Sequence, residues 1–220
     1  MSWYCACMKL SKQDIIDAGV TFIGLKGPAG SGKTTATKVM RQHFQDALVL
    51  PGSHYHYKAT VEDGKLSKSV FGRTFNSESE ALQYYLENES AELLVSWITK
   101  SLPCINDMYK GDIKKLLSQN FIPNPIIADW AFANALEDVW GLTTNKLGVS
   151  ATQEVIARNQ GIREGKDTSS IRSAMAFLYG VGEPADMIIE NLISDDLTDY
   201  NDKVKKYCDS IIVNDSSKIF

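Results

Sequence analysis

The sequence predicts an α/β fold in which helices cover both faces of a mainly parallel sheet. Three observations lead to this prediction. Short apolar runs of strand character alternate along the chain with segments of helical periodicity. One of these runs leads through a glycine-rich loop directly into a helix. The 220 residues are 44% hydrophobic and 23% charged, which suits a large core. We therefore expect one domain spanning residues 1–220.

The glycine-rich loop runs from Gly27 to Thr34 and is the most specific motif in the chain. It reads G-P-A-G-S-G-K-T, which satisfies G-x-x-x-x-G-K-[S/T], between the apolar run 21–25 and a predicted helix. Glycines allow positive φ, so successive backbone N–H groups converge on an anion, and the following helix points its positive end there. The motif predicts the three-layer P-loop NTPase fold.

ATP and Mg²⁺ are the cofactors that this loop predicts. Lys33 is expected to reach the β- and γ-phosphates, and the Thr34 hydroxyl is expected to hold Mg²⁺. The loop identifies a superfamily but leaves the reaction open. The predicted nucleotide-binding residues are Gly27, Pro28, Ala29, Gly30, Ser31, Gly32, Lys33, Thr34 and Thr35.

The remaining elements are predicted from apolar patterning and from start and stop signals. Ser11 and Asp14 suit a helix start and Gly19 its stop, and 58–77 is polar enough to be a loop. Residues 58–120 as a whole are predicted to form a mostly helical insertion. The further predicted strands are 47–50, 125–129, and the apolar run D-S-I-I-V-N-D at 209–215. The further predicted helices are 78–101, 113–117, 136–140, 151–160, 171–179 and 195–208.

Composition argues against several classes of protein, namely strongly basic nucleic-acid-binding, membrane-spanning and secreted proteins. The net charge of −4 argues against a strongly basic nucleic-acid-binding surface, and no apolar run reaches the length of a membrane span. The N-terminal residues lack the pattern of a secretory signal. The four cysteines, at 5, 7, 104 and 208, show no metal-binding spacing beyond one C-x-C pair, so we expect reduced thiols in a cytoplasmic protein.

Two carboxylates stand where predicted strands end. Asp129 ends I-I-A-D, and Asp215 ends I-I-V-N-D. The carboxyl ends of parallel strands face the ligand crevice, so either aspartate is a candidate to hold hydrated Mg²⁺ or to serve as the base for a phosphate acceptor. Capping of the following helix is the alternative for Asp129.

Arginines and histidines supply weaker signals. Arg158, Arg163 and Arg172 lie close together in and after a polar segment, where guanidinium groups on a lid suit phosphate oxygens. A solvated helix face is the alternative for each of them. His54 and His56 would share one face of a strand, as metal ligands can, but packing over the strand end is the favoured interpretation.

Two segments resemble phage-type deoxynucleoside monophosphate kinases. The stretch 126–142 is similar to that group's F-A-D-P-L-K segment and the helix after it, and 169–188 is similar to its R-x-x-(L/M)-Q-x-L-G segment. The resemblance implies an ATP- and Mg²⁺-dependent kinase that converts a deoxynucleoside monophosphate to its diphosphate. It implies contact between Arg172 and the monophosphate, and it makes Asp215 the Walker-B-like metal ligand beside Thr34. Together with the loop, the strand ends and the arginine cluster, this makes Arg158, Arg163, Arg172 and Asn134 the candidate acceptor-binding residues. The candidate catalytic residues are Lys33, Asp129, Asp215 and Arg172.

The sequence departs from that family at several places. Asn134 stands where the family has aspartate, about 80 residues separate the first helix from the matching segment, and the chain ends five residues after Asp215. In a second alignment, A-D-M-I-I-E-N at 185–191 is similar to a strand of dephospho-coenzyme A kinases. In the same alignment, Arg158 and Arg163 are the arginines of the lid. Both alignments imply the same reaction class.

Other functions remain open. The insertion has lysines and aromatic residues interleaved, as a kinase acting on a modified base in DNA would need, although its acidic residues weaken that reading. A nucleoside acceptor, and an ATPase or switch without a small acceptor, are further alternatives. A small-molecule nucleotide is the expected partner, nucleic acid is not favoured, no membrane is expected, and a homodimer is left open.

Overall fold

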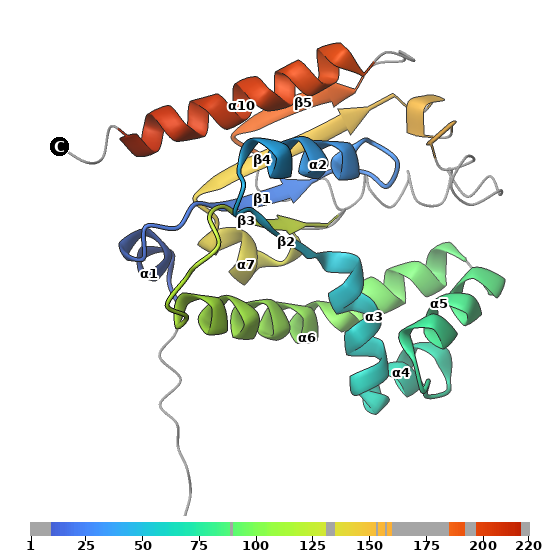
Figure 1. Cartoon of the computed structure of the whole chain (residues 1–220). Coiled ribbons are helices and arrows are strands. Elements are labelled where there is room, and N and C mark those ends of the chain that lie inside the picture. Colours follow the sequence, from blue (N-terminus) through green and yellow to red (C-terminus); the bar gives the residue numbers. More distant parts are fainter. Residues whose placement is uncertain are drawn as a thin grey trace, which may run out of the picture.

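A five-stranded parallel sheet forms the centre of the molecule (Figure 1). The structure is a computed structural model that describes residues 10–88, 90–130, 135–152, 154–156, 158–159, 185–191 and 197–216. The strand order is β2-β3-β1-β4-β5, and every neighbouring pair is parallel. The predicted fold class is confirmed. The strands are β1 Phe22–Lys26, β2 Leu48–Pro51, β3 Ile126–Asp129, β4 Asn145–Ala151 and β5 Met187–Asn191.

Helices cover both faces of the sheet, and alternate residues of each strand supply the two cores. Helices α2 (Lys33–His43) and α10 (Thr198–Ser216) lie on one face, where Ile23 and Leu25 of β1 are buried (Figure 1). The other face carries α1, α7 and a helical lobe of four helices, residues 52–117. The helices on this face are α1 Lys12–Asp17, α3 Gly52–Glu62, α4 Gly64–Phe71, α5 Glu78–Glu87, α6 Ala91–Leu117 and α7 Glu137–Leu142.

Local signals placed several elements correctly. Ser11 and Asp14 form a capping box at the start of α1, and Gly19, at φ +68°, follows its end. Strands β1, β2 and β3 fall within one residue or so of the predicted runs. Strand β5 lies in A-D-M-I-I-E-N, as the second alignment expected. A short apolar run between polar segments is the pattern expected of a strand whose two faces are both buried.

Four predictions about secondary structure were wrong. The segment 58–77, predicted as a loop, contains the last five residues of α3 and all of α4. His54 and His56 also belong to α3, so they lie on a helix and not on a strand. Helices were predicted at 78–101 and 113–117, but the structure has α5 at Glu78–Glu87 and one 27-residue helix, α6, which runs from Ala91 to Leu117 through Pro103. Strand β4 was missed, because its sequence N-K-L-G-V-S-A resembles a turn and becomes a strand between β1 and β5.

The fourth correction concerns Asp215. Residues 209–215 belong to α10 and not to a strand, so Asp215 does not end a strand at the ligand edge of the sheet. Buried Tyr200, Val204, Tyr207 and Ile211 recur at helical spacing, which extends the helical pattern into the apolar run. A short apolar run cannot by itself be distinguished from a buried helix segment.

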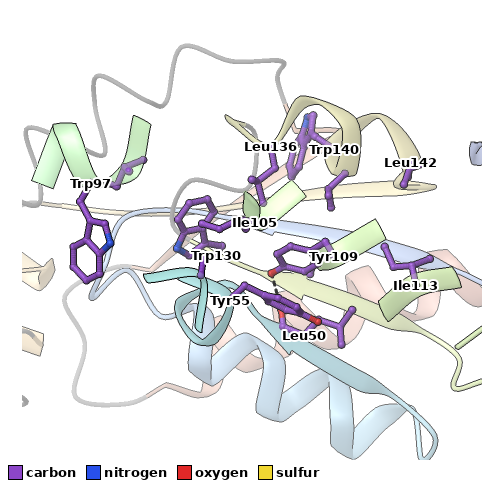
Figure 2. Close-up of a cluster of buried hydrophobic side chains, with 14 of the residues drawn as sticks. Leu50, Tyr55, Trp97, Ile105, Tyr109, Ile113, Trp130, Leu136, Trp140 and Leu142 are labelled. Atoms are coloured by element: carbon purple, nitrogen blue, oxygen red, sulfur yellow. Dashed lines mark hydrogen bonds between the residues drawn. The ribbon is translucent and has the colours of Figure 1, made fainter. Parts of the chain in front are cut away.

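Aromatic side chains join the helical lobe to the sheet (Figure 2). Tyr109 of α6 donates a hydrogen bond to the Leu50 carbonyl of β2 at 2.9 Å and stacks on Tyr55 of α3, with ring centroids 4.1 Å apart. Trp130, directly after β3, packs against Gly52, where a Cβ atom would overlap the indole ring. The lobe is therefore anchored on the carboxyl ends of β2 and β3.

His56 lies inside this aromatic cluster. Its ring stacks on Trp97 at 4.0 Å and meets Trp130 edge-on at 5.8 Å, and its Nε2 atom is buried without a hydrogen-bond partner. Burial lowers the pKa of His56 to about 3, and a hydrogen bond with the Trp97 backbone acts in the opposite direction. The imidazole is therefore neutral at physiological pH.

His56→Phe is expected to make stability less dependent on pH. Below pH 6.5 the unfolded imidazole takes up a proton while the folded one stays neutral down to about pH 3, so the wild type loses stability as pH falls through this window. The loss between pH 6.5 and 5 is about 2 kcal/mol, and the phenylalanine variant should lack it. Urea denaturation across this range measures the difference. Parallel wild-type and His56→Phe curves would contradict the prediction.

Candidate active site

The P-loop follows β1 at the carboxyl edge of the sheet and has the backbone geometry of an anion cradle. Gly27, Gly30 and Gly32 have φ values of +151°, +85° and +110°, which side-chain-bearing residues rarely adopt. A Cβ atom on Gly27 would overlap the Val149 carbonyl oxygen of β4. Helix α2 begins at Lys33 with no side-chain cap, so its first N–H groups face the loop without a side-chain acceptor.

Three side chains from distant parts of the chain hold the loop carbonyls. The amide of Asn191, at the end of β5, donates to the Ser31 carbonyl at 3.0 Å, and Asn159 donates to Gly30 at 2.8 Å. The Tyr200 hydroxyl of α10 donates to Gly32 at 3.1 Å. Because these three carbonyls accept hydrogen bonds from side chains, they point away from the concave side of the loop, where backbone N–H groups can bind an anion. Asn159 and Tyr200 had no role in the sequence predictions, and the only signal for Asn191 was its place at the end of an apolar run.

Lys33 and Asp129 bring opposite charges to the same edge. The Lys33 ammonium donates to the carbonyls of Gly27 and Pro28 at 2.7 and 2.9 Å. Asp129 ends β3 in register with Leu25 of β1, two residues before the loop. Burial raises the pKa of Asp129, and the charge of Lys33 acts in the opposite direction. Asp129 is therefore the aspartate that the described residues place at the ligand edge.

The loop residues suit a triphosphate. Ser31 is fully buried, and its Oγ has no hydrogen-bond partner, so a polar atom in the cradle is left for a ligand or water. Thr34 is exposed in the first turn of α2, where its hydroxyl could hold a hydrated Mg²⁺. The described part of the chain contains no cluster of three or more His, Cys, Asp or Glu side chains able to hold a metal.

Of the other predicted site residues, the structure places one beside the P-loop. Arg158 is partly buried and directly precedes Asn159, so it lies beside the P-loop. Asn134, Arg163 and Arg172 lie outside the described residues, as does the side chain of Asp215. Cys104 and Cys208 are free thiols. No helix among the described residues is both long and apolar enough to cross a lipid bilayer.

No protein-family model matches the chain, and no curated protein matches its sequence. Solved structures do resemble it. TT1252 from Thermus thermophilus superimposes with a TM-score of 0.59 at 17% identity, over 89% of this chain and 97% of that one. The chain has a P-loop kinase-like fold. A gluconokinase from Sinorhizobium meliloti 1021 superimposes with a TM-score of 0.50 at 12% identity, over 91% of this chain and 98% of that one. Identities this low establish the fold alone.

Gly27→Ala is expected to abolish ATP binding and to lower the free energy of unfolding by about 3 kcal/mol. The added Cβ meets the Val149 carbonyl oxygen and is strained at φ +151°, so the loop must leave β4. Calorimetric titration with ATP and denaturant unfolding measure the two effects. Gly111→Ala is the control, because a Cβ there meets nothing within 4 Å. ATP binding by Gly27→Ala at the wild-type affinity would contradict the prediction.

Proposed function

We propose that the protein is an ATP-dependent kinase that transfers the γ-phosphate to a small acceptor, a deoxynucleoside monophosphate. One observation carries the proposal: a P-loop lysine and a carboxylate from a neighbouring strand converge at the edge of the sheet. Phosphoryl transfer needs positive charge around the moving group, a carboxylate for the hydrated metal, and a positioned acceptor. Lys33, Thr34 and Asp129 provide the first two requirements.

Each of these residues would have a separate role in the transfer of the phosphoryl group. The loop N–H groups and Lys33 would bind and orient the triphosphate, and Thr34 with Asp129 would hold Mg²⁺, which neutralises charge on the phosphates when bound. A monophosphate is largely deprotonated at neutral pH, so such an acceptor needs no base. A hydroxyl acceptor would instead require Asp129 to accept its proton. The role of Asp129 thus depends on the acceptor.

The choice of a nucleotide acceptor rests on the resemblance of 126–142 and 169–188 to deoxynucleoside monophosphate kinases. The S. meliloti protein of the same fold is a gluconokinase, so sugar acids belong among the candidate acceptors. The lobe of α3 to α6 adjoins the carboxyl ends of β2 and β3, so it can form one wall of the acceptor site.

Phosphate transfer from labelled ATP with Mg²⁺ tests the proposal. The acceptor panel contains deoxynucleoside monophosphates, nucleosides, dephospho-coenzyme A, gluconate and duplex DNA with a hydroxymethylated base. We expect one deoxynucleoside monophosphate to become a diphosphate. Label found only as free phosphate would overturn the kinase proposal in favour of an ATPase or switch. Label in DNA, lost at raised salt, would identify a kinase acting on nucleic acid.

A further inference from the structure

Two side chains from the C-terminal part of the chain close over Gly32, the residue that precedes α2. The Nδ2 amide of Asn191 donates to the Ser31 carbonyl at 3.0 Å, and the Tyr200 hydroxyl donates to the Gly32 carbonyl at 3.1 Å. A Cβ atom on Gly32 would lie 2.9 Å from Nδ2 of Asn191 and 3.2 Å from the Tyr200 hydroxyl oxygen. The missing side chain of Gly32 thus lets both donors approach the loop closely.

Both donors are buried and belong to elements of the domain core. Asn191 ends β5, and Tyr200 lies in the first turn of α10; each is 3% exposed. Strand β5 pairs with β4, and α10 packs against α2 and β5 (Figure 1). Burial raises the pKa of Tyr200, and the charge of Asp129 raises it further, so the hydroxyl keeps its proton and can donate.

The two hydrogen bonds fix the directions of two backbone N–H groups. In a trans peptide unit, the C=O of one residue and the N–H of the next point in opposite directions. Holding the Ser31 carbonyl therefore orients the N–H of Gly32, and holding the Gly32 carbonyl orients the N–H of Lys33. Both N–H groups belong to the part of the P-loop that binds phosphates at the start of the helix.

The two donors are not equivalent. The Gly32 carbonyl also accepts the N–H of Ala36 at 2.9 Å, so Tyr200 adds a second hydrogen bond to it. Asn191 is the only donor to the Ser31 carbonyl that the described residues provide. Removing the amide would leave that carbonyl unpaired, which costs more than removing one of two hydrogen bonds. We therefore expect the larger effect at Asn191.

We propose that Asn191 and Tyr200 are positioning residues for the phosphates of ATP, because they hold the P-loop in the conformation that binds them. The inference rests on the proposed function, since it takes ATP to be the ligand of the loop. It gives β5 and α10 a role in ATP affinity that the loop motif does not contain. A loop that is already ordered loses less conformational entropy when its ligand binds, so the affinity is higher.

Calorimetric titration tests the positioning role without any turnover. The ligands are ATP and tripolyphosphate, each with Mg²⁺; tripolyphosphate has the phosphates of ATP and no nucleoside. Asn191→Leu keeps a branched side chain and removes the donor, and it should weaken both ligands about tenfold or more. Tyr200→Phe should weaken both about threefold. A loss for ATP alone would overturn the inference, because it would indicate a contact with the nucleoside.

Tyr207→Phe is the matched control for Tyr200→Phe. Tyr207 lies further along the same helix, is buried to a similar degree, and its hydroxyl has no hydrogen-bond partner. Removing this hydroxyl releases no loop carbonyl, so both affinities should stay within about twofold of the wild type. Equal losses in Tyr207→Phe and Tyr200→Phe would overturn the role of Tyr200. Thermal unfolding identifies any variant that fails to fold, and if Asn191→Leu does so, Tyr200→Phe carries the test.

Steady-state kinetics distinguish positioning of the loop from a general loosening of the domain. In Tyr200→Phe the KM for ATP should rise about threefold, while the KM for the acceptor changes less than about twofold. The reason is that the two hydrogen bonds act on the loop that binds the triphosphate and not on the acceptor side. Equal increases in the two KM values would overturn the inference.

The results separate the positioning role from the kinase proposal. A wild type that binds both ligands, with unchanged affinities in Asn191→Leu and Tyr200→Phe, would overturn the positioning role and leave the kinase intact. Weakened binding in both variants of a protein that transfers phosphate to no acceptor would overturn the kinase proposal and leave the positioning role intact. A wild type that binds neither ligand would overturn both.

Discussion

Lys33→Ala is expected to lower the rate of phosphate transfer from ATP by about 100-fold or more. In the structure the Lys33 ammonium is held over the loop by hydrogen bonds to the carbonyls of Gly27 and Pro28. Under the proposed function, removing it deletes the positive charge that would stabilise negative charge on the transferred group. The decrease should appear mainly in kcat, measured with labelled ATP and the acceptor identified in the panel assay.

Lys38→Ala provides the matched comparison for this variant. Lys38 is an exposed lysine on the same helix, so its removal changes the net charge equally without touching the loop. Its kcat should remain within about twofold of the wild type, as expected for a surface substitution. An equal loss of activity in Lys38→Ala, or full activity in Lys33→Ala, would contradict the assignment of Lys33.

Asp129→Asn is expected to lower kcat by about 100-fold while leaving the folded protein at least as stable as the wild type. The amide is nearly the same size as the carboxylate, but it binds hydrated Mg²⁺ poorly and accepts no proton. Burial raises the pKa of Asp129, which means that the negative charge of its carboxylate destabilises the folded state at neutral pH. A structural aspartate would show the opposite pattern, with lost stability and retained activity.

The sign of the pH effect at Asp129 can be checked directly. The folded carboxyl holds its proton above pH 3.8, the ordinary pKa, whereas the unfolded carboxyl releases it there. Its contribution to stability is therefore greatest below pH 3.8 and decreases as the pH rises through the raised pKa. Denaturation of the wild type and Asp129→Asn from pH 3.5 to 7 should give a stability difference that grows with pH. A constant difference would contradict the raised pKa.

The activity of Asp129→Asn also reports on the acceptor. If Asp129 serves the metal, added Mg²⁺ should restore part of the activity, because weaker binding is offset by mass action. If Asp129 accepts a proton from a hydroxyl acceptor, Mg²⁺ should restore nothing, and the acid limb of the wild-type pH–rate profile should be absent. The Mg²⁺ titration therefore distinguishes the two roles that the sequence left open.

Local signals were enough for the nucleotide loop and for much of the sheet. G-P-A-G-S-G-K-T needs only a strand before it and a helix after it, and its backbone geometry follows from the glycines themselves. Strands β1, β2 and β3 are short apolar runs between polar segments. This pattern is typical of strands buried on both faces, as β1 and β3 are, and it also identified the partly exposed edge strand β2. Ser11 and Asp14 likewise fix the start of α1 by neighbouring contacts alone.

The secondary-structure predictions were wrong or incomplete where contacts with distant segments decide the structure. Residues 209–215 are apolar enough for a strand, but they form the last part of α10, which packs against α2 and β5. Asp215 therefore does not lie at the end of a strand, as had been predicted. Residues 145–151 look like a turn, but hydrogen bonding to β1 and β5 makes them a strand. In both cases the pairing partner lies far away in the chain.

The fold class, the phosphate-binding loop and Asp129 as a candidate at its edge could all be predicted from the order of residue types, because each prediction depends on short contiguous segments. Only the tertiary structure brought Asn159, Asn191 and Tyr200 onto the loop carbonyls, 129 to 168 residues away. Strand pairing and helix packing set these contacts, and a linear pattern of residue types does not encode which distant segments will meet.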